Sequence, residues 1–377
     1  MDLRIQIHNG GVWHDAARVD IANPPIGVSG PSLTSYELDY VFGDWNIAGL
    51  AAGTHAIDSH AISIALPVCL DPHRAPRWPA FLVDLLPQGH ARRRIADSMK
   101  ASPDESRIDL PLLISGAGNS IGNIRVYEAW EVEQQRTRDV RLPGLTTSDL
   151  LGTSDRFLEA AEKCALVATG STGVQGEWPK LLLTRLANGL WYPDSIVSDD
   201  DAKEHVLVKM VRGNKEVDAK ILAAEAAYLE VASRIRPESW QGSDLRRPKA
   251  RRSPVRSCSD DQRPTAAGPG EPYLCLGTRR IRPIMTHEDC LALIQRVATD
   301  PARETIEYLL CDVLNLAMGN SDNHGRNTAL HKFEDGTIAL SPLYDFAPML
   351  LDEATIARST KWQIMKGHDF HPDWAKV

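Results

Sequence analysis

The sequence contains no long apolar run and no excess of basic charge. Its longest apolar stretch, Ala61–Leu70, has ten residues, about half of the ~20 needed to cross a bilayer. The first residues, MDLRIQIHNGG, lack the basic-then-apolar order of an export signal. Acidic residues outnumber basic ones by 50 to 42, whereas proteins that coat nucleic acid concentrate positive charge. We therefore expect a cytoplasmic protein without a membrane segment or an extended nucleic-acid-binding surface.

Metal-binding cysteine motifs are missing as well. Six cysteines occur, but at least fourteen residues separate any two neighbours, and neither CxxC nor HExxH is present. This pattern excludes a zinc ribbon or a zinc finger. We expect reduced, mostly buried thiols.

The composition is that of a soluble globular protein. The chain has 377 residues, of which 43% are apolar and 24% charged, and this length predicts two or three domains. We expect a β-rich N-terminal subdomain over residues 1–135, an α+β segment over 150–235, an irregular basic and proline-rich segment over 236–283, and a helical region with a hairpin over 284–377.

Local patterns predict individual elements within these segments. Runs of apolar and β-branched residues between turns predict strands, and apolar residues at helical spacing predict helices. The expected strands are Leu38–Phe42, Ala61–Val68, Leu181–Arg185 and His205–Met210, and the expected helices are Ala91–Ile95, Ala219–Ile235 and a helix from Pro301 that ends near Gly319.

A hairpin follows the last of these helices. Asp335-Gly336 is a strong two-residue turn signal between two strand-like runs. A turn of two residues would place Asn327 opposite Tyr344, next to Asp345. Because cross-strand neighbours lie ~4.5–5.5 Å apart at Cα, the side chains of Asn327 and Asp345 should converge on one cation.

Asp322 precedes Asn327 by five residues and completes a set of oxygen donors. Two carboxylates and an amide suit Mg²⁺, which prefers oxygen ligands. Such residues also fill ordinary turns, but the order D-x-x-x-x-N followed by a later Asp is the order of a protein-kinase site. A weaker interpretation is a metal-dependent phosphohydrolase that uses Asp322, His324 and Asp345.

A glycine-rich segment lies upstream, where a phosphate-binding half would be expected. Its glycines have the spacing G-x-x-G-x-x-G, which lets backbone N–H groups approach phosphates, although plain surface turns show the same spacing. The candidate phosphate-binding residues in this segment are Gly170, Ser171, Thr172, Gly173, Val174 and Gln175.

Two lysines and a glutamate extend this nucleotide-binding candidate. Lys180 opens one predicted strand, and Lys209 ends another in the manner of the kinase V-A-I-K strand. Glu225 shares a helix face with Ile221, so it could pair with a lysine as in kinases. The alternatives are solvent-exposed lysines and a glutamate that reaches water.

Four blocks of the sequence resemble the HipA-like kinases, the serine/threonine kinases of bacterial type II toxin–antitoxin systems. The blocks are FLVDLLPQG, STGVQGEWPK, GNSDNHGRNTAL and LSPLYDFAP, which lie between residues 80 and 350. The GVQ segment fused to EWPKLLL is similar to the HipT-like branch. The resemblance implies an α+β, two-lobed protein-kinase-like fold with the N-terminal β-rich subdomain.

The resemblance also implies an activity and its residues. It implies ATP- and Mg²⁺-dependent phosphate transfer to a protein serine or threonine and to the kinase itself. Asp322 corresponds to the catalytic base, within a catalytic loop that includes His324 and Arg326. Asn327 and Asp345 correspond to the metal ligands. The segment that begins at Ser171 corresponds to the phosphate loop, and Lys209 corresponds to the nucleotide-contacting lysine.

The implied partners are a DNA-binding helix-turn-helix antitoxin and an aminoacyl-tRNA synthetase as the phosphorylated target. DNA would be reached only through the antitoxin.

Two departures from the family support an alternative function. Arg246–Pro254 stands where relatives have an adenine-binding hinge strand, and relatives continue for several helices beyond the Tyr-Asp block, whereas this sequence ends at Val377. We expect residues 236–283 to be poorly ordered, because prolines and mutually repelling arginines disfavour a strand. We also expect the affinity of the chain for nucleotide to be low. The alternative is a catalytically impaired, kinase-shaped binding module that engages an antitoxin or corepressor complex.

Overall fold

The structure is a computed structural model that describes residues 1–43, 60–87, 89–120, 122–151, 157, 180–211, 215–235, 273–275, 286–333 and 336–365. The described residues form two compact units, one up to Met210 and one from Val211 onward. Within these residues, every helix is too short or too polar to cross a bilayer. The predicted mixture of helices and strands is confirmed.

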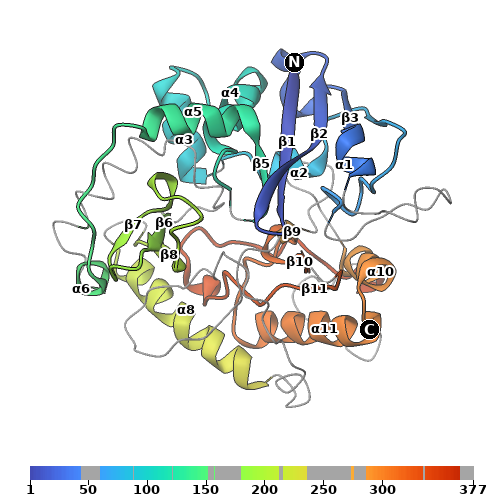
Figure 1. The fold of residues 1–377 in the computed structure, drawn as a ribbon. Helices are drawn as coiled ribbons and strands as arrows, with labels where there is room; N and C mark the ends of the chain where they lie inside the picture. The colour runs from blue at the N-terminus through green and yellow to red at the C-terminus, as the bar shows by residue number, and fades with distance from the viewer. Residues whose placement is uncertain are drawn as a thin grey trace. The chain divides into compact units, whose positions relative to one another are not determined.

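The first unit is built on a five-stranded antiparallel sheet with the strand order β4-β3-β2-β1-β5. Its strands are β1 (Asp2–Asn9), β2 (Val12–Ile21), β3 (Ser32–Tyr36), β4 (His73–Ala75) and β5 (Ile124–Val126), with β1 and β2 forming a long pair (Figure 1). Leu3, Ile5 and Ile7 alternate along β1 and are fully buried, because successive side chains of a strand point to opposite faces.

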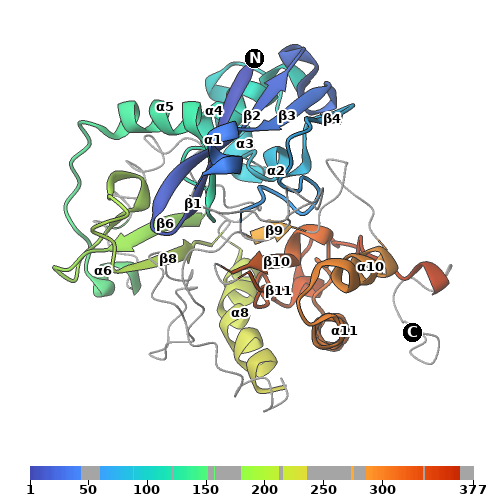
Figure 2. The same cartoon turned by 45° about the vertical axis from the view of Figure 1, so that its right-hand side comes forward.

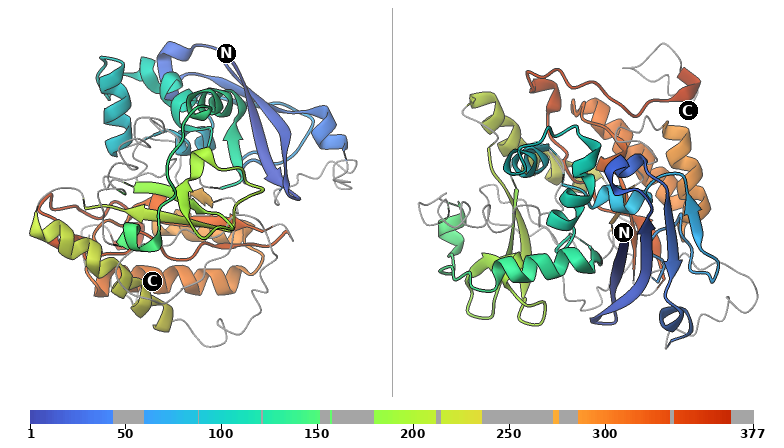
Figure 3. Two further views of the ribbon diagram at one scale, coloured as in Figure 1. Left: turned by 60° about the vertical axis from the view of Figure 1, so that its left-hand side comes forward. Right: turned by 90° about the horizontal axis from the view of Figure 1, so that it is seen from above.

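Short helices complete the core beneath this sheet. They are α1 (Leu38–Phe42), α2 (Ala80–Asp84), α3 (Gly89–Ser98), α4 (Asp109–Gly116) and α5 (Tyr127–Thr137). Helix α5 follows β5 directly and lies beside β1 (Figure 3). Leu112 and Leu113 of α4 are fully buried in the same apolar core as the β1 side chains.

Two predicted strands of this unit are wrong. Leu38–Phe42 is helix α1, and Ala61–Val68 consists of bends and turns with isolated bridge residues, among them the pair Ser63 and Leu66. In α1, Tyr40 and Val41 are buried in the core, and the Tyr40 hydroxyl donates to the carbonyl of His60 at 2.7 Å. Strand propensity over a few residues is weak, so tertiary packing decides the conformation of such segments.

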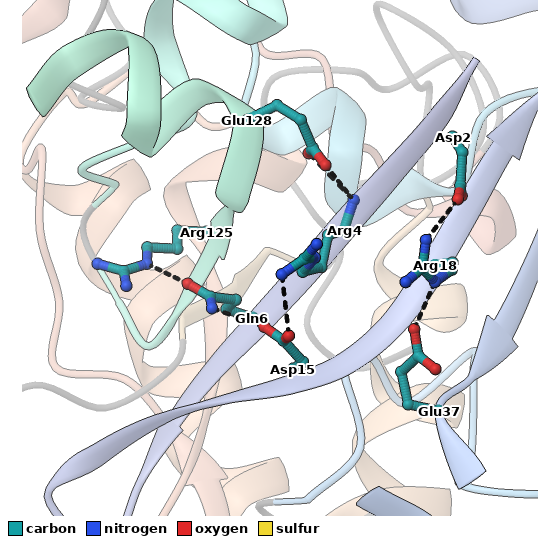
Figure 4. A network of polar contacts seen from close by, with 8 residues as sticks. All are labelled: Asp2, Arg4, Gln6, Asp15, Arg18, Glu37, Arg125 and Glu128. Atoms are coloured by element: carbon teal, nitrogen blue, oxygen red, sulfur yellow. Dashed lines mark hydrogen bonds and ion pairs between the residues drawn. The ribbon is translucent and has the colours of Figure 1, made fainter. Parts of the chain in front are cut away.

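Polar side chains link the outer faces of the neighbouring strands (Figure 4). Arg18 pairs with both Asp2 and Glu37, and Arg4 pairs with Asp15. The same network continues through Gln6, which bonds Asp15 at 2.7 Å and accepts from Arg125 at 2.8 Å. Ion pairs this exposed are screened by solvent and contribute little to stability, so the apolar core supplies most of the stability of this sheet.

A second, three-stranded antiparallel sheet in the first unit has the order β7-β6-β8. It consists of β6 (Lys180–Arg185), β7 (Trp191–Pro193) and β8 (Glu204–Lys209), preceded by α6 (Thr147–Leu151). The predicted strands at 181–185 and 205–210 are therefore confirmed to within one residue. Asn119 donates to Asp194 at 2.6 Å and the Trp13 indole to Asp199 at 3.3 Å, so hydrogen bonds tie this sheet to the N-terminal one.

The second unit contains the helices α8 (Glu216–Ile235), α10 (His287–Val297) and α11 (Pro301–Ala317). The side chain of Asp300 caps α11 by accepting from the Arg303 N–H at 3.1 Å, and Pro301 opens the helix, as predicted. Thr286 and Asp289 form a capping box at the start of α10. Figure 2 shows α10 and α11 beside a small sheet. Its strands, in spatial order, are β11 (Ile338–Leu340), β10 (Ala329–Lys332) and β9 (Tyr273–Cys275).

The hairpin after α11 differs from the prediction by one residue. Strand β10 (Ala329–Lys332) pairs with β11 (Ile338–Leu340), but Leu330 lies opposite Leu340 and not opposite Ser341. The predicted two-residue turn is wrong, because Phe333 and Thr337 are hydrogen-bonded at 2.8 Å and enclose three residues. Gly336, at φ 86°, takes the left-handed position that three-residue hairpin loops require. Asn327 lies before the strand in a 3-10 turn, Gly325–Asn327, so the predicted pairing of Asn327 with Tyr344 is also wrong.

Part of the segment expected to be irregular is a strand. Tyr273–Cys275 forms β9, antiparallel to β10 with Leu274 opposite Leu330. A free edge of β10 offers backbone N–H and C=O groups to any extended neighbour, which local composition does not reveal. The rest of the segment 236–283, including Arg246–Pro254, lies outside the described residues.

Candidate functional site

The loop that follows α11, Gly319–Asn327, carries the predicted catalytic residues. Gly319 has φ 71° and ends the helix, a position that favours glycine. Asn320 then bonds back to Asn315 twice, through its backbone N–H and its side-chain amide, both at 2.8 Å. The Asn320 side-chain oxygen accepts from the Asp322 N–H at 3.3 Å. Asn320 therefore holds the backbone at Asp322 in a fixed turn.

Asp322, His324 and Asn327 lie together on this loop. The Asp322 side chain is 32% exposed, and its Oδ1 lies 3.6 Å from Nε2 of His324. The Asn327 side-chain Nδ2 donates to the Asp322 carbonyl at 2.7 Å. That bond identifies the donor end of the amide, so the oxygen is the end left for a ligand. Arg326 lies in the same 3-10 turn, but its side chain lies outside the described residues.

Asp345 adopts an uncommon backbone conformation. Its φ is 50°, in the left-handed region where residues other than glycine are infrequent and cluster at functional sites. The side chain is half-buried, and the following residue, Phe346, is fully buried. That Asp345 and Asn327 share one coordination sphere stays a prediction.

The donor set of these residues fits Mg²⁺. No cluster of three or more His, Cys, Asp or Glu side chains that could hold a metal ion occurs among the described residues. Magnesium in phosphoryl-transfer sites needs only one or two carboxylates, since waters and phosphate oxygens supply the other ligands. Asp345, Asp322 and the amide oxygen of Asn327 meet that requirement.

A buried polar network that the sequence analysis did not predict lies beneath the loop. Asp312 of α11 is 2% exposed, and its carboxylate accepts from Asn323 at 3.1 Å, from the Trp362 indole at 3.0 Å and from Arg358. A sequence signal exists, because Glu304, Tyr308 and Asp312 recur every four residues on the buried face of α11, where apolar residues would be expected.

Burial controls the ionisation of the groups around Asp312. It lowers the pKa of His287, although the Asp312 carboxylate lies 3.5 Å away. His287 is therefore a neutral imidazole, bonded through Nδ1 to the Tyr308 hydroxyl at 2.9 Å. Burial also raises the pKa of Tyr308 well above its usual value and that of the Cys290 thiol to about 11. Asp312 is therefore paired with one cation, Arg358.

The two candidate nucleotide-binding lysines lie opposite each other in the first unit. Lys180 of β6 pairs with Lys209 of β8, so both side chains are on one face of the sheet at the same end. Like charges placed directly opposite repel each other. Leu182 and Leu207 form the next pair on that face and are buried. The arrangement is a pair of cations beside an apolar surface.

The remaining candidate residues divide between the described and the masked parts of the chain. The glycine segment Gly170–Gly176 lies outside the described residues. Glu225 is 5% exposed and shares the buried face of α8 with Ile221, so the alternative in which it reaches water is wrong. Lys209 and Glu225 belong to different units, and their pairing stays a prediction.

Comparisons with known proteins identify two regions of this chain. The family model of the HipA N-terminal domain matches residues 51–127, and that of the HipA-like C-terminal domain matches residues 276–377. A protein named "Putative kinase Y4mE", from Sinorhizobium fredii, is 37% identical over 60 residues. That stretch covers 16% of this chain and 14% of the length of Y4mE.

A solved structure shares the fold over nearly the whole chain. It is HipA of the Shewanella oneidensis MR-1 toxin–antitoxin system, in complex with HipB and operator DNA. The match has a TM-score of 0.50 at 14% identity and covers 95% of this chain and 79% of HipA. The fold is therefore the kinase-like fold of HipA, with an N-terminal antiparallel sheet. Since both HipA domain families match in the expected order, the chain belongs to the HipA-like family.

Proposed function

We propose that this chain is an ATP- and Mg²⁺-dependent serine/threonine protein kinase. The observation that carries the proposal is the loop after α11, where the partly exposed carboxylate of Asp322 stands beside an Asn327 amide bonded to the Asp322 carbonyl at 2.7 Å. Asn327 follows Asp322 by five residues, which is the sequence spacing between the catalytic base and the metal-binding asparagine of protein kinases.

Each residue of the loop has a role in this proposal. Asp322 accepts the proton of the attacking hydroxyl, and His324 lies close enough to orient its carboxylate. The amide oxygen of Asn327 and the carboxylate of Asp345 would hold Mg²⁺. When bound, the ion neutralises charge on the transferring phosphate.

The lysine pair of the first unit supports nucleotide binding. Lys180 and Lys209 face each other across β6 and β8, and two cations at one end of a sheet attract an anion. The triphosphate of ATP is such an anion, and the buried Leu182–Leu207 pair beside the lysines suits its apolar base. Lys209→Met should raise the KM for ATP about tenfold, because a phosphate contact to a charged group is lost.

The same proposal extends to a cellular role. HipA of the solved complex belongs to a toxin–antitoxin system and is bound to HipB and operator DNA. By this likeness the chain acts in the cytoplasm as the toxin of a type II system. A DNA-binding helix-turn-helix antitoxin restrains it and provides its only link to DNA. Its target is a serine or threonine of a protein, with an aminoacyl-tRNA synthetase as the first substrate to assay.

The decisive experiment separates binding from transfer. Binding of ATP with Mg²⁺ is measured by calorimetry, and phosphate transfer by radiolabel from γ-labelled ATP, for the wild type and three variants. Asp322→Asn should keep ATP affinity and lose at least a hundredfold in transfer, because only the base is removed. Asp345→Ala should lose both transfer and the Mg²⁺ dependence of binding. Glu353→Gln, an exposed carboxylate of the same unit paired with Lys215, should change neither.

Two results would contradict the kinase. Transfer that survives both Asp322→Asn and Asp345→Ala would mean that the loop is not the catalytic site. A wild-type chain that binds no ATP would favour the kinase-shaped binding module that engages the antitoxin without turnover.

A further inference from the structure

The carboxylate of Asp312 is deeply buried beneath the proposed catalytic loop. Its side chain is 2% exposed, and that of its cation partner Arg358 is 7% exposed. A carboxylate removed from water is costly unless it is paired and its oxygens accept hydrogen bonds. Arg358 supplies the charge, and the N–H groups of Asn323 and Trp362 occupy further acceptor positions at 3.1 and 3.0 Å. We call these four residues the Asp312 network.

Asn323 connects this network to the catalytic loop. It lies between Asp322 and His324 and is 8% exposed, whereas its neighbours are 32% and 40% exposed. The Asn323 side chain donates to Asp312. Its carbonyl accepts from the backbone N–H groups of Ser359 and Thr360 at 3.3 and 3.1 Å. The residue is therefore held at its side chain and at its backbone.

The segment after Arg358 is itself held in place. The His287 N–H donates to the Lys361 carbonyl at 3.1 Å, and the ring of Trp362 stacks on that of His287 with centroids 4.6 Å apart. Glu288 accepts from the backbone N–H groups of Gln363 and Ile364 at 2.9 and 3.1 Å. The segment 358–364 is thus fixed to α10 on one side and to the catalytic loop on the other.

We propose that Asp312 is a positioning residue, which acts through Asn323 to hold Asp322 and His324 in the geometry used for phosphate transfer. The inference rests on the proposed kinase function. Asp312 itself touches neither substrate nor metal. Its hydrogen bond with Asn323 restricts the loop to one conformation, in which Asn323 points inward and its two neighbours, Asp322 and His324, point outward. A residue misplaced by about 1 Å can cost a hundredfold in rate.

The test compares kcat, the KM for ATP and the melting temperature of the full-length chain. Asn323→Ala removes the bond to Asp312 but keeps the backbone carbonyl, and Asp312→Asn removes one acceptor. Both should lower kcat roughly a hundredfold and leave the KM for ATP within about twofold, because the lysine pair that contacts the nucleotide is intact. Tyr308→Phe is the matched control, since it deletes a buried hydroxyl of the same helix that bonds His287 at 2.9 Å and not the loop. It should lower the melting temperature without a comparable loss of kcat.

A conservative variant tests whether the bond itself matters. Asn323→Gln keeps a side-chain amide that can donate to the Asp312 carboxylate, whose partners Arg358 and Trp362 are unchanged. This variant should recover at least tenfold in kcat over Asn323→Ala. A kcat loss in Asn323→Ala and Asp312→Asn no larger than that of Tyr308→Phe, or no recovery in Asn323→Gln, would overturn the inference. If Asp322→Asn loses phosphate transfer while Asn323→Ala transfers normally, the positioning inference is overturned but the kinase proposal is not.

Discussion

The N-terminal sheet and the catalytic loop are stabilised in opposite ways. The sheet packs Leu3, Ile5 and Ile7 against apolar helices, and its polar contacts lie on the outside. The loop is held from beneath by a buried carboxylate whose partners are polar. Apolar packing is non-directional, whereas hydrogen bonds specify angles and partners.

This contrast explains which region can carry chemistry. An apolar core tolerates exchanges that conserve volume, so the sheet needs only shape and hydrophobicity. A buried polar network loses most of its value when one member is removed. The loop therefore gains a defined conformation at the cost of sensitivity to single substitutions.

The largest loss of stability is expected when a member of the buried polar network beneath the catalytic loop is removed. Arg358→Leu leaves Asp312 buried without its cation and should destabilise the second unit by about 3–5 kcal/mol. Arg234→Leu, which removes the exposed pair with Glu230 on α8, should cost less than about 0.5 kcal/mol. Denaturant unfolding of both variants checks the difference, and equal losses would contradict a structural role for the buried pair.

A large-to-small substitution in the apolar core of the first unit should destabilise it by leaving a cavity. Leu112→Ala, at a fully buried position of α4, should cost about 2–4 kcal/mol in the first unit. Leu38→Ala, where the side chain is 62% exposed, should stay within about 0.5 kcal/mol. Hydrogen exchange resolved by residue should report the Leu112→Ala loss in β1 and β2. Loss confined to the second unit would argue against two separate cores.

The two regions should also differ in their response to pH. Burial lowers the pKa of His287 below its usual 6.5, so below pH 6.5 the unfolded chain binds a proton that the folded chain does not. The contribution of His287 to stability is complete above pH 6.5. It should fall by up to about 1.4 kcal/mol per pH unit as the pH drops toward the lowered pKa.

The variant His287→Gln isolates this effect. Its melting temperature should fall less steeply between pH 6.5 and pH 5 than that of the wild type. Glu304, whose pKa burial raises, acts in the opposite direction, but it is present in both proteins and cancels in the comparison. Parallel slopes for the two proteins would mean that His287 is not the group responsible.

The smallest effect is expected in the hairpin turn. Gly336 has φ 86°, and an added Cβ would meet no atom within 4 Å. Gly336→Ala should therefore cost about 1 kcal/mol, from the left-handed backbone alone. Gly336→Asn should cost less, because asparagine tolerates that conformation. Thermal unfolding ranks the two variants, and the reverse order would point to a steric effect instead.

Local signals predicted much of the fold correctly. The cap and proline at Asp300-Pro301, the continuous apolar runs of β6 and β8, and the face of α8 that contains Ile221 all depend on residues close together in sequence. The errors arose where distant contacts decide. Leu38–Phe42 became a helix because Tyr40 and Val41 pack in the core, and the hairpin register moved by one residue because the loop holds three residues.

By itself, the sequence determined β6, β8, α8 and α11, the order of the motifs and the grouping of Asp322, His324 and Asn327 on one loop, since all of these follow from near neighbours. Only the tertiary structure decided that Lys180 faces Lys209 and that Asn323 bonds to Asp312. The first pairing depends on strand register across more than twenty residues of chain. The second depends on a helix face, a loop and the segment from Arg358 to Trp362 meeting in one buried place, where a charge is stable only if all its partners arrive together.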